Sequence, residues 1–194
     1  MNDDFIKYLF FIVFIVIAAV VVSSVFILNR KRRAGKTGGD GEKKASGSFQ
    51  PVSGGNVSIF FDKQGNATII PYVADLTGSG KATSDVVFLY RPFKSRELGN
   101  TIRSSLASCR DGKPADSYKL MERLGEQDWK KFSEGKLNLS VYYKEGIGMI
   151  FNTTVRTPEG AYVFNKRGVE FSLAANADDE TIGSTALQLL NRCR

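Results

Sequence analysis

The chain has 194 residues, a hydrophobic content of 42% and a formal net charge of +7 at neutral pH. This length is enough for one domain with attachments, and the apolar fraction allows a sizeable core. The sequence contains no histidine. The usual metal ligand and the usual general base near neutral pH are therefore both missing, which argues against a hydrolase.

The positive charge is unevenly distributed along the chain. Residues 1–55 carry eight basic and four acidic side chains, whereas residues 56–194 carry nineteen basic and sixteen acidic ones. Much of the basicity therefore belongs to the N-terminal segment. This distribution weakens an assignment to nucleic-acid binding, and we expect no nucleic-acid partner.

A membrane-spanning helix is predicted near the N-terminus. After a polar tail over residues 1–7, residues 8–28 form an apolar run without a single charge, and about 20 such residues span the hydrocarbon core as a helix. A cleavable signal peptide is the alternative, but its apolar part is usually shorter and is followed by a small-residue cleavage site. Here basic residues follow instead, so we predict an uncleaved single-pass anchor.

The residues after the apolar run predict the orientation of this anchor. Four consecutive basic residues follow Asn29: Arg30, Lys31, Arg32 and Arg33. Because positive charge is retained on the cytoplasmic side, the C-terminal domain is predicted to face the cytoplasm from the inner membrane, with the opposite orientation as the alternative. The basic cluster can also rest on the anionic headgroups of the lipid bilayer. Residues 29–55 are predicted to be a flexible tether, basic at first and then rich in Gly, Ser and Lys, with a reach of roughly 25 Å.

The first part of the C-terminal domain predicts three strands. They are expected over residues 56–62, 67–73 and 85–91. These runs are rich in β-branched and aromatic residues and are separated by turn signals. Pro71 cannot donate a ladder hydrogen bond and therefore suggests an edge or the end of pairing. The small-residue loop over residues 77–80 lacks the spacing of a phosphate-binding loop, so we interpret it as a turn.

A helix is expected to follow the third strand. It opens at Lys94 or Ser95, with Ser95 as a plausible N-cap. Its apolar side chains fall on a single helical face: Leu98, Ile102, Leu106 and Cys109. This periodicity indicates a helix that buries one side.

A linker over residues 111–136 predicts two short helices. Asp116 or Ser117 can cap the first, and Gly125 ends it. The second covers residues 128–132 and places Trp129 and Phe132 three residues apart on one face. Such an aromatic pair can serve a cofactor or peptide, but a core plug beneath the linker is the simpler interpretation.

The remaining residues predict further strands and a final helix. The strands are expected over residues 139–144, 147–156, 161–165 and 169–173. The acidic segment 176–180 then opens a helix that reaches Cys193, because negative charge is favourable at the positive end of a helix dipole.

Two parts of the chain resemble each other at a nearly constant spacing. Glu97–Arg110 matches Thr181–Arg194 at an offset of 84 residues, with Gly, Thr, Leu, Cys and Arg recurring. Upstream, Ser58–Gly65 resembles Ser140–Gly146. A self-match of this kind predicts a duplicated β-β-β-α unit.

We therefore expect one two-layer α+β domain over residues 56–194, built from copies over residues 56–110 and 137–194. Whether the copies form one continuous sheet stays open at this point. Cys109 and Cys193 occupy equivalent positions at the ends of the repeat helices. We interpret them as small apolar residues with free thiols, since a disulfide requires an oxidising compartment and close geometry.

No catalytic constellation is visible in the sequence. There is no histidine, and neither cysteine has a local partner that would activate it. The cluster Asp178-Asp179-Glu180 can start a helix or bind Mg²⁺, and the helix start is simpler because a metal site needs ligands that converge in space. The pairs Lys130-Lys131 and Lys166-Arg167 are expected to be solvated, or to meet an acidic partner. We thus predict neither an enzyme nor a cofactor.

Several short runs resemble a known family. They are Leu120–Gly125, Trp129–Gly135, Asp178–Gly183, the pair Leu189-Leu190 and the final Cys193-Arg194. Together they resemble the immunity proteins of bacterial contact-dependent growth inhibition systems. The resemblance covers about Val57 to Arg194 and omits the membrane helix and tether, which the typical soluble member lacks.

This resemblance implies a protein that binds and neutralises the toxin domain of an inhibitor delivered by a neighbouring cell. The anchor would then hold the antidote where the toxin emerges. The alternative is a membrane-tethered structural or envelope-associated interaction domain without a toxin partner. The sequence does not identify the surface that binds the toxin.

Overall fold

The computed structural model describes residues 52–74, 80–165 and 168–193. The predicted transmembrane helix 8–28, the basic cluster that follows it and most of the tether lie outside these residues. Within the described ranges, no helix has both the length and the apolar character needed to cross a bilayer.

The described residues form a mixed α/β domain. The strands are β1 Asn56–Phe61, β2 Ala67–Ala74, β3 Gly80–Ala82, β4 Val87–Leu89, β5 Leu137–Lys144, β6 Gly148–Arg156, β7 Tyr162–Phe164 and β8 Glu170–Leu173. The helices are α2 Ser95–Ser108, α3 Ser117–Leu124, α4 Trp129–Ser133 and α5 Asp179–Leu190.

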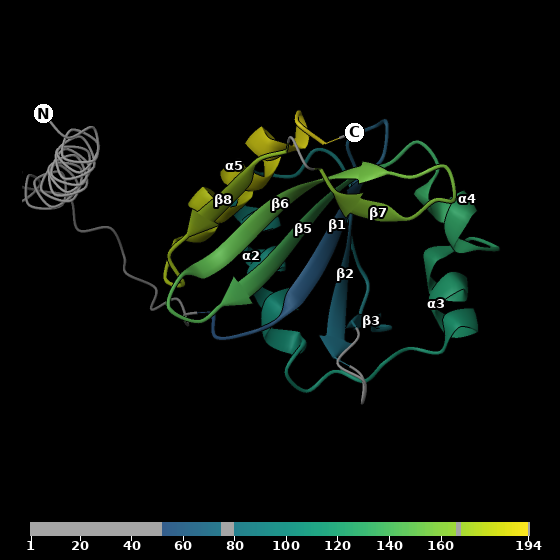
Figure 1. The fold of residues 1–194 in the computed structure, drawn as a ribbon, viewed down its shortest axis with the longest axis horizontal. Helices are drawn as coiled ribbons and strands as arrows, with labels where there is room; N and C mark the ends of the chain where they lie inside the picture. The colour runs from purple at the N-terminus through teal and green to yellow at the C-terminus, as the bar shows by residue number, and fades with distance from the viewer. Residues whose placement is uncertain (1–51, 75–79, 166–167, 194) are drawn as a thin grey trace, which may run out of the picture. The chain divides into compact units, whose positions relative to one another are not determined.

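All eight strands belong to one curled antiparallel sheet (Figure 1). The strand order is β3-β2-β1-β5-β6-β7, with β4 also paired to β2 and β8 also paired to β6. At the centre, β1 pairs antiparallel with β5. This pairing answers the question that the sequence left open, because it joins the two halves of the domain into a single sheet.

The two halves of the sheet repeat each other in register. Ser58 lies opposite Ser140, its counterpart 82 residues later, at the middle of the β1–β5 pair. Adding 82 to both members of the pair Phe61↔Ala67 gives Tyr143↔Met149, which is also observed. The halves are therefore related by an approximate two-fold arrangement about this serine pair, as a duplicated unit would be.

Each half contains four strands, as expected for the second half, whereas three were expected in the first half. The additional strand in the first half, β3, begins at Gly80, which we had assigned to a turn. Both β3 and β4 pair with β2 and divide its length between them. A strand of only three residues carries too little periodicity to be recognised in the sequence.

Of the two alternatives for Pro71, the sheet edge was wrong, whereas an end of pairing is seen on one side of β2. β2 is an interior strand, and Pro71 lies opposite Val57 of β1. On its other side, the Pro71 carbonyl accepts a hydrogen bond from the Thr83 amide at 2.9 Å. Thr83 follows the end of β3, and β4 pairs only with residues 67–69, so the missing proline N–H falls between the two short strands, where it costs little.

Helices α2 and α5 cover one face of the sheet and cross at a pair of glycines. A Cβ atom on Gly99 would lie 1.8 Å from the Asp179 carbonyl oxygen, and one on Gly183 would lie 1.8 Å from that of Ser95. The contact is thus symmetric between the halves. The predicted apolar face of α2 is buried, as expected: Leu98, Ile102, Leu106 and Cys109.

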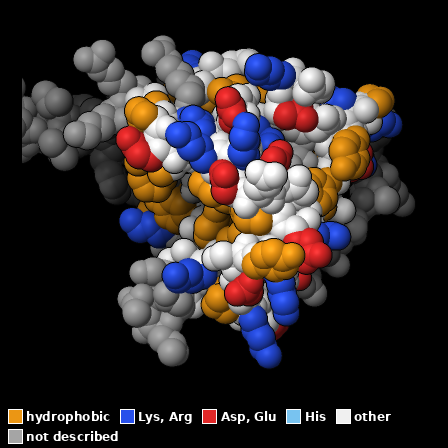
Figure 2. Space-filling view, turned by 90° about the vertical axis from the view of Figure 1, so that its right-hand side faces the viewer, with side chains coloured by type: hydrophobic (Ala, Val, Ile, Leu, Met, Phe, Trp, Pro, Cys, Tyr) orange, Lys and Arg blue, Asp and Glu red, His pale blue; other side chains and the backbone are white. Residues whose placement is uncertain are grey.

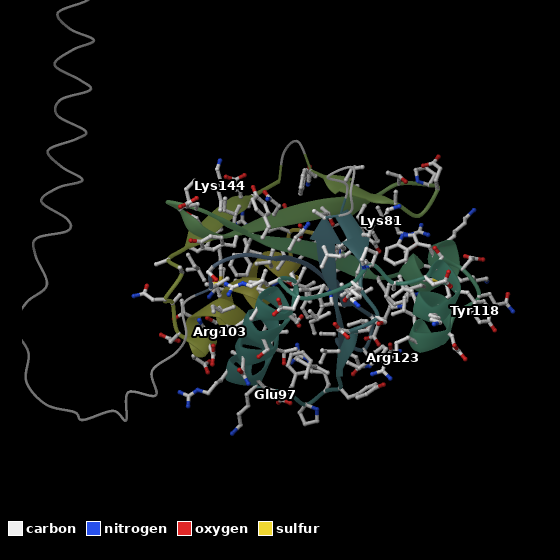
Figure 3. The ribbon with its side chains drawn as sticks, turned by 90° about the horizontal axis from the view of Figure 1, so that it is seen from below. Lys81, Glu97, Arg103, Tyr118, Arg123 and Lys144 are labelled. Atoms are coloured by element: carbon white, nitrogen blue, oxygen red, sulfur yellow. The ribbon has the colours of Figure 1, made fainter. Side chains whose placement is uncertain are left out.

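The opposite face of the sheet carries a partial third layer, which corrects the predicted two-layer architecture. Phe60 and Ile70 point away from α2 and α5 and form a second apolar cluster with Leu120 and Leu124 of α3 and Phe132 of α4. Seen from below, α2 and α5 lie under the sheet, whereas α3 lies to one side, with Tyr118 at its outer surface (Figure 3). The third layer exists because these back-facing apolar side chains need a cover.

One of the two predicted N-caps is present, and α4 has an N-cap that was not predicted. Asp116 accepts a hydrogen bond from the Tyr118 amide at 2.9 Å, and Gly125 ends α3 with a left-handed φ of 69°. Asp128 accepts from the Lys131 amide at 2.8 Å at the start of α4. Ser95 is not a cap, however, because α2 begins at Ser95 itself and Lys94 holds the N-cap position without a side-chain bond.

Candidate functional site

The acidic cluster at residues 178–180 is a helix start rather than a metal site. Asp178 caps α5 and accepts a hydrogen bond from the Thr181 amide at 2.8 Å, which lowers the pKa of its carboxyl group. Asp179 is buried and pairs with Arg103 of α2, with 2.7 Å between Oδ1 and Nε. Throughout the described ranges, no three acidic or cysteine side chains are grouped in a way that could hold a metal ion.

Of the two predicted basic pairs, only Lys130-Lys131 lies in the described part of the chain. Lys130 and Lys131 are exposed on α4, and the Lys131 ammonium lies 4.0 Å from the Glu134 carboxylate, a surface contact of little energetic weight. Lys166 and Arg167 lie outside the described residues. The face that carries α3 and α4 mixes side chains of both signs (Figure 2).

Both cysteines are buried free thiols, as predicted. Burial raises the pKa of the Cys109 and Cys193 thiols above its ordinary value. Because the thiolate is the nucleophile, neither group is prepared for catalysis.

Trp129 and Phe132 form the expected core plug. Their ring centroids are 5.2 Å apart, and Phe60 of β1 makes edge contacts with both rings at 5.5 and 5.1 Å. Phe132 is buried, whereas Trp129 is only partly covered. Its remaining surface borders the site described next.

Comparison of the two halves of the sheet reveals a difference in polarity on the back face. On the back face of the first half, Phe60 and Ile70 lie under α3 and α4. Their counterparts in the second half, 82 residues later, are Tyr142 and Asn152, and neither belongs to that apolar cluster. At these two positions the second half is polar where the first half is apolar, whereas Thr68 of the first half corresponds to the buried Ile150.

Two neighbouring hollows occupy this part of the back face. The central hollow has a volume of about 210 Å³ and is lined by Asn56, Ser58, Phe60, Tyr72, Trp129, Asn138, Ser140, Thr154, Tyr162 and Phe164. The flanking hollow has a volume of about 270 Å³ and is lined by Tyr142, Asn152, Thr153, Phe164, Asn165, Gly168, Val169 and Glu170. Phe164 of β7 borders both, and we call the two hollows together the sheet trough.

One wall of the trough is held by hydrogen bonds between β7 and the end of α4. The Tyr162 hydroxyl lies 3.0 Å from the Ser133 carbonyl oxygen and 2.7 Å from that of Lys136. Arg156 adds a bond from Nε to the Ser133 hydroxyl at 3.1 Å and one to the Lys130 carbonyl at 3.2 Å. Burial raises the pKa of Tyr162 to about 12, so its hydroxyl keeps the proton that it donates. We call this set of bonds the α4–β7 clasp.

Small polar side chains form the floor of the central hollow. The Thr154 hydroxyl donates to the Asn138 carbonyl at 2.6 Å, and the Asn138 amide donates to the Ile59 carbonyl at 3.4 Å. Ser58 shares a hydrogen bond with the hydroxyl of Tyr72. Burial raises the pKa of Tyr72 despite this bond. The floor therefore presents hydroxyl and amide groups at the seam between β1 and β5.

The central hollow contains no side chain that is charged at neutral pH. This is notable in a chain with 24% charged residues. Its residues include no nucleophile with an adjacent base, so the arrangement suits the binding of a neutral group. Sequence reasoning missed this site, although aligning the two copies would have shown apolar Phe60 and Ile70 replaced by polar Tyr142 and Asn152.

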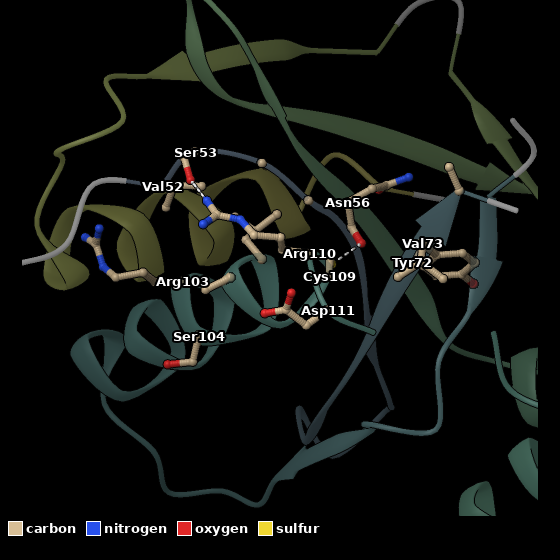
Figure 4. Close-up of a pocket in the computed structure, with 15 residues that line it drawn as sticks. Val52, Ser53, Asn56, Tyr72, Val73, Arg103, Ser104, Cys109, Arg110 and Asp111 are labelled. Atoms are coloured by element: carbon tan, nitrogen blue, oxygen red, sulfur yellow. Dashed lines mark hydrogen bonds between the residues drawn. The ribbon is translucent and has the colours of Figure 1, made fainter. Parts of the chain in front are cut away.

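A larger hollow of about 650 Å³ lies at the C-terminal end of α2 (Figure 4). Several of its polar side chains already have partners within the chain, including both of its arginines. Arg110 donates to the Ser53 hydroxyl, Arg103 is paired with Asp179, and the Cys109 thiol donates to the Asn56 carbonyl at 3.3 Å. We therefore regard the sheet trough as the better candidate site.

The fold resembles solved structures, although no protein-family model and no curated protein matches the sequence. One similar structure is a protein of unknown function, NMB0488, from Neisseria meningitidis, with a TM-score of 0.57 and 15% identity over 76% of this chain and 99% of that one. Another is a chain of the CdiA-CT/CdiI toxin and immunity complex from Yersinia pseudotuberculosis, with a TM-score of 0.56 and 12% identity over 75% of this chain and 100% of that one. These likenesses establish a CdiI-like fold for the domain.

Proposed function

We propose that this chain is an immunity protein that binds and neutralises the toxin domain of a contact-dependent growth inhibition system. The observation that carries the proposal is the likeness of the domain to a chain of a toxin and immunity complex, over the whole length of that chain. The short runs that resemble such immunity proteins point the same way. A protein toxin is accordingly the proposed partner.

The state of the reactive side chains in the domain favours a binding function over catalysis. Asp179 forms an ion pair with Arg103, and both thiols are buried with raised pKa values. The central hollow of the sheet trough offers neutral polar and aromatic groups, which suit recognition. We therefore propose that the chain acts as an inhibitor and not as an enzyme.

We further propose that residues 8–28 anchor this antidote in the inner membrane, with the domain in the cytoplasm and the basic cluster from Arg30 to Arg33 against the lipid surface. The support is the uncharged length of the apolar run and the positive charge after it. If the anchor places the antidote where the toxin enters, deletion of residues 1–33 should weaken protection of cells. Full protection by the deleted chain would remove this part of the proposal.

The decisive experiment is co-expression with the toxin domain encoded beside this gene. Rescue of growth, together with a stable complex that is recovered through a tag on either partner, is the expected result. A toxin domain from an unrelated inhibition system serves as the control and should remain lethal. Absence of both rescue and complex would instead favour an envelope-associated interaction domain without a toxin partner.

A further inference from the structure

The central hollow combines aromatic walls with a polar floor. The walls are formed by Phe60, Tyr72, Trp129, Tyr162 and Phe164, and the floor by Asn56, Ser58, Asn138, Ser140 and Thr154. Aromatic walls favour a flat ring, because rings gain from edge and stacking contacts beyond the area that they bury. Hydroxyl and amide groups require a hydrogen-bonding partner. A ligand that satisfies both carries a ring with a polar group.

Ser140 is the residue that we expect to bond to the polar group of the ligand. Ser140 is largely buried as a residue, but its hydroxyl is not, since Thr157 Oγ1 is the only described side-chain atom that is both buried and without a partner. Its symmetry counterpart Ser58 is bonded to Tyr72. The Ser140 hydroxyl lines the hollow and is therefore accessible to a hydrogen-bonding group of a ligand.

The volume and neutrality of the hollow limit what can enter it. About 210 Å³ holds one large side chain rather than a chain segment. A charged group would lose its hydration without gaining an opposite charge, since all ten lining residues are neutral. Protein interfaces are anchored above all by tryptophan, tyrosine and arginine. Neutrality disfavours arginine, and the Ser140 hydroxyl favours a phenol.

We propose that the central hollow receives one tyrosine side chain of the partner protein. The ring lies between Trp129 and Phe164, and the phenol hydroxyl bonds to Ser140. Only the identity of the partner rests on the proposed function. The chemistry of the hollow rests on its own residues, so it can be tested without the toxin.

Trp129 provides a built-in reporter, because it is the only tryptophan of the chain and lines the hollow. The full chain in detergent micelles is titrated with N-acetyl-L-tyrosinamide while tryptophan fluorescence is excited selectively. We expect a saturable change, with half-saturation on the order of 1 mM for so small a probe. N-acetyl-L-phenylalaninamide should bind about fivefold more weakly, since it lacks the hydroxyl.

Two variants test the geometry. F164A removes a wall residue that is 64% exposed, so the fold should tolerate the change, and it should raise the half-saturation concentration at least about fivefold. V163A is the matched control, because Val163 is 51% exposed on the same strand and does not line the hollow. It should bind the probe as the unmodified chain does. S140A should abolish the preference for tyrosinamide over phenylalaninamide.

Three results would overturn the inference. They are the absence of a saturable response, equal binding by F164A, and tighter binding of N-acetyl-argininamide or N-acetylglucosamine than of the tyrosine probe. Failure of the immunity proposal is separate, since it shows as a lack of rescue by the co-expressed chain. A chain that binds tyrosinamide but gives no rescue would support the proposal for the central hollow and contradict the proposed toxin partner.

Discussion

Gly99 and Gly183 determine how closely α2 and α5 approach each other. Each glycine faces the backbone of the other helix, with no room for a β-carbon. The two residues are 84 positions apart and occupy equivalent places in the halves of the domain. Beside them, the Arg103–Asp179 pair ties the same helices together in a buried setting. At the residue scale, two small contacts therefore define the helix layer.

Replacing Gly99 by alanine should destabilise the domain by about 3 kcal/mol, because the added methyl group forces two packed helices apart. Urea unfolding of the full chain in micelles, followed by Trp129 fluorescence, measures the change. G54A is the control, since a β-carbon on Gly54 meets nothing within 4 Å. An equal stability of both variants would contradict the close crossing.

Removing the Asp179 carboxylate should cost about 3–5 kcal/mol, because D179A leaves the buried Arg103 guanidinium without its counter-charge. The neighbouring variant D178A loses only an exposed helix cap and should cost about 1 kcal/mol. The double variant R103M/D179A should recover part of the loss. If urea denaturation shows that D178A lowers the stability more than D179A, Asp179 is not the more important of the two carboxylates for stability.

At the scale of elements, the inserted helices α3 and α4 break the symmetry of the sheet. They pack on the apolar residues of the back face in the first half, whereas the back face of the second half holds the two hollows of the sheet trough. The α4–β7 clasp connects this insertion to the second half of the sheet. The sheet trough therefore lies where the inserted helices, which have no counterpart in the second half, contact the symmetric sheet.

Y162F should loosen the clasp and lower stability by about 1 kcal/mol, since the ring still packs but its hydrogen bonds to the Ser133 and Lys136 carbonyls are lost. The pH dependence has a defined sign. The folded pKa of about 12 exceeds the ordinary value of 10.0, so the folded state holds this proton more tightly, and its contribution is complete below about pH 10 and is lost as the pH rises towards 12.

Unfolding in urea at pH 9 and pH 11 tests this sign. The unmodified chain should lose more stability between the two pH values than Y162F does. A phenylalanine variant with the same alkaline sensitivity would show that other groups, such as Tyr72, account for it. Y118F is a suitable control, because Tyr118 is largely exposed and takes no part in the clasp.

At the scale of the whole molecule, the β1–β5 pair makes the two halves one cooperative unit. Leu139 of β5 is fully buried and belongs to the same apolar cluster as residues of β1, α2 and α5. A core that extends across the seam should unfold as one. The symmetric architecture therefore does not imply two independently stable halves.

L139A should destabilise the entire domain by about 2–5 kcal/mol and shift every probe equally, because it leaves a cavity at the centre of the shared core. Trp129 fluorescence and far-ultraviolet circular dichroism, recorded during the same urea titration, should give coincident transitions. K144A, at the exposed end of the same strand, should change little. Two separated transitions would instead indicate halves that unfold separately.

The sequence by itself determined the features that depend on neighbours along the chain. The cap Asp116, the end of α3 at Gly125, the acidic start of α5 and the apolar face of α2 all follow from spacings of a few residues, and all are present in the structure. The apolar run over residues 8–28 is a feature of the same local kind, and it stays a prediction. The internal repeat also came from the sequence, since equivalent positions keep equivalent residues.

Only the tertiary structure decided how distant segments meet. The pairing of β1 with β5, the interior place of Pro71 and the crossing of Gly99 with Gly183 each join residues far apart in the chain. No local periodicity encodes such contacts, because they depend on which faces become buried together. The same reason made the sheet trough impossible to find from local patterns, because its lining residues come mainly from six strands and one helix that meet only in the folded domain.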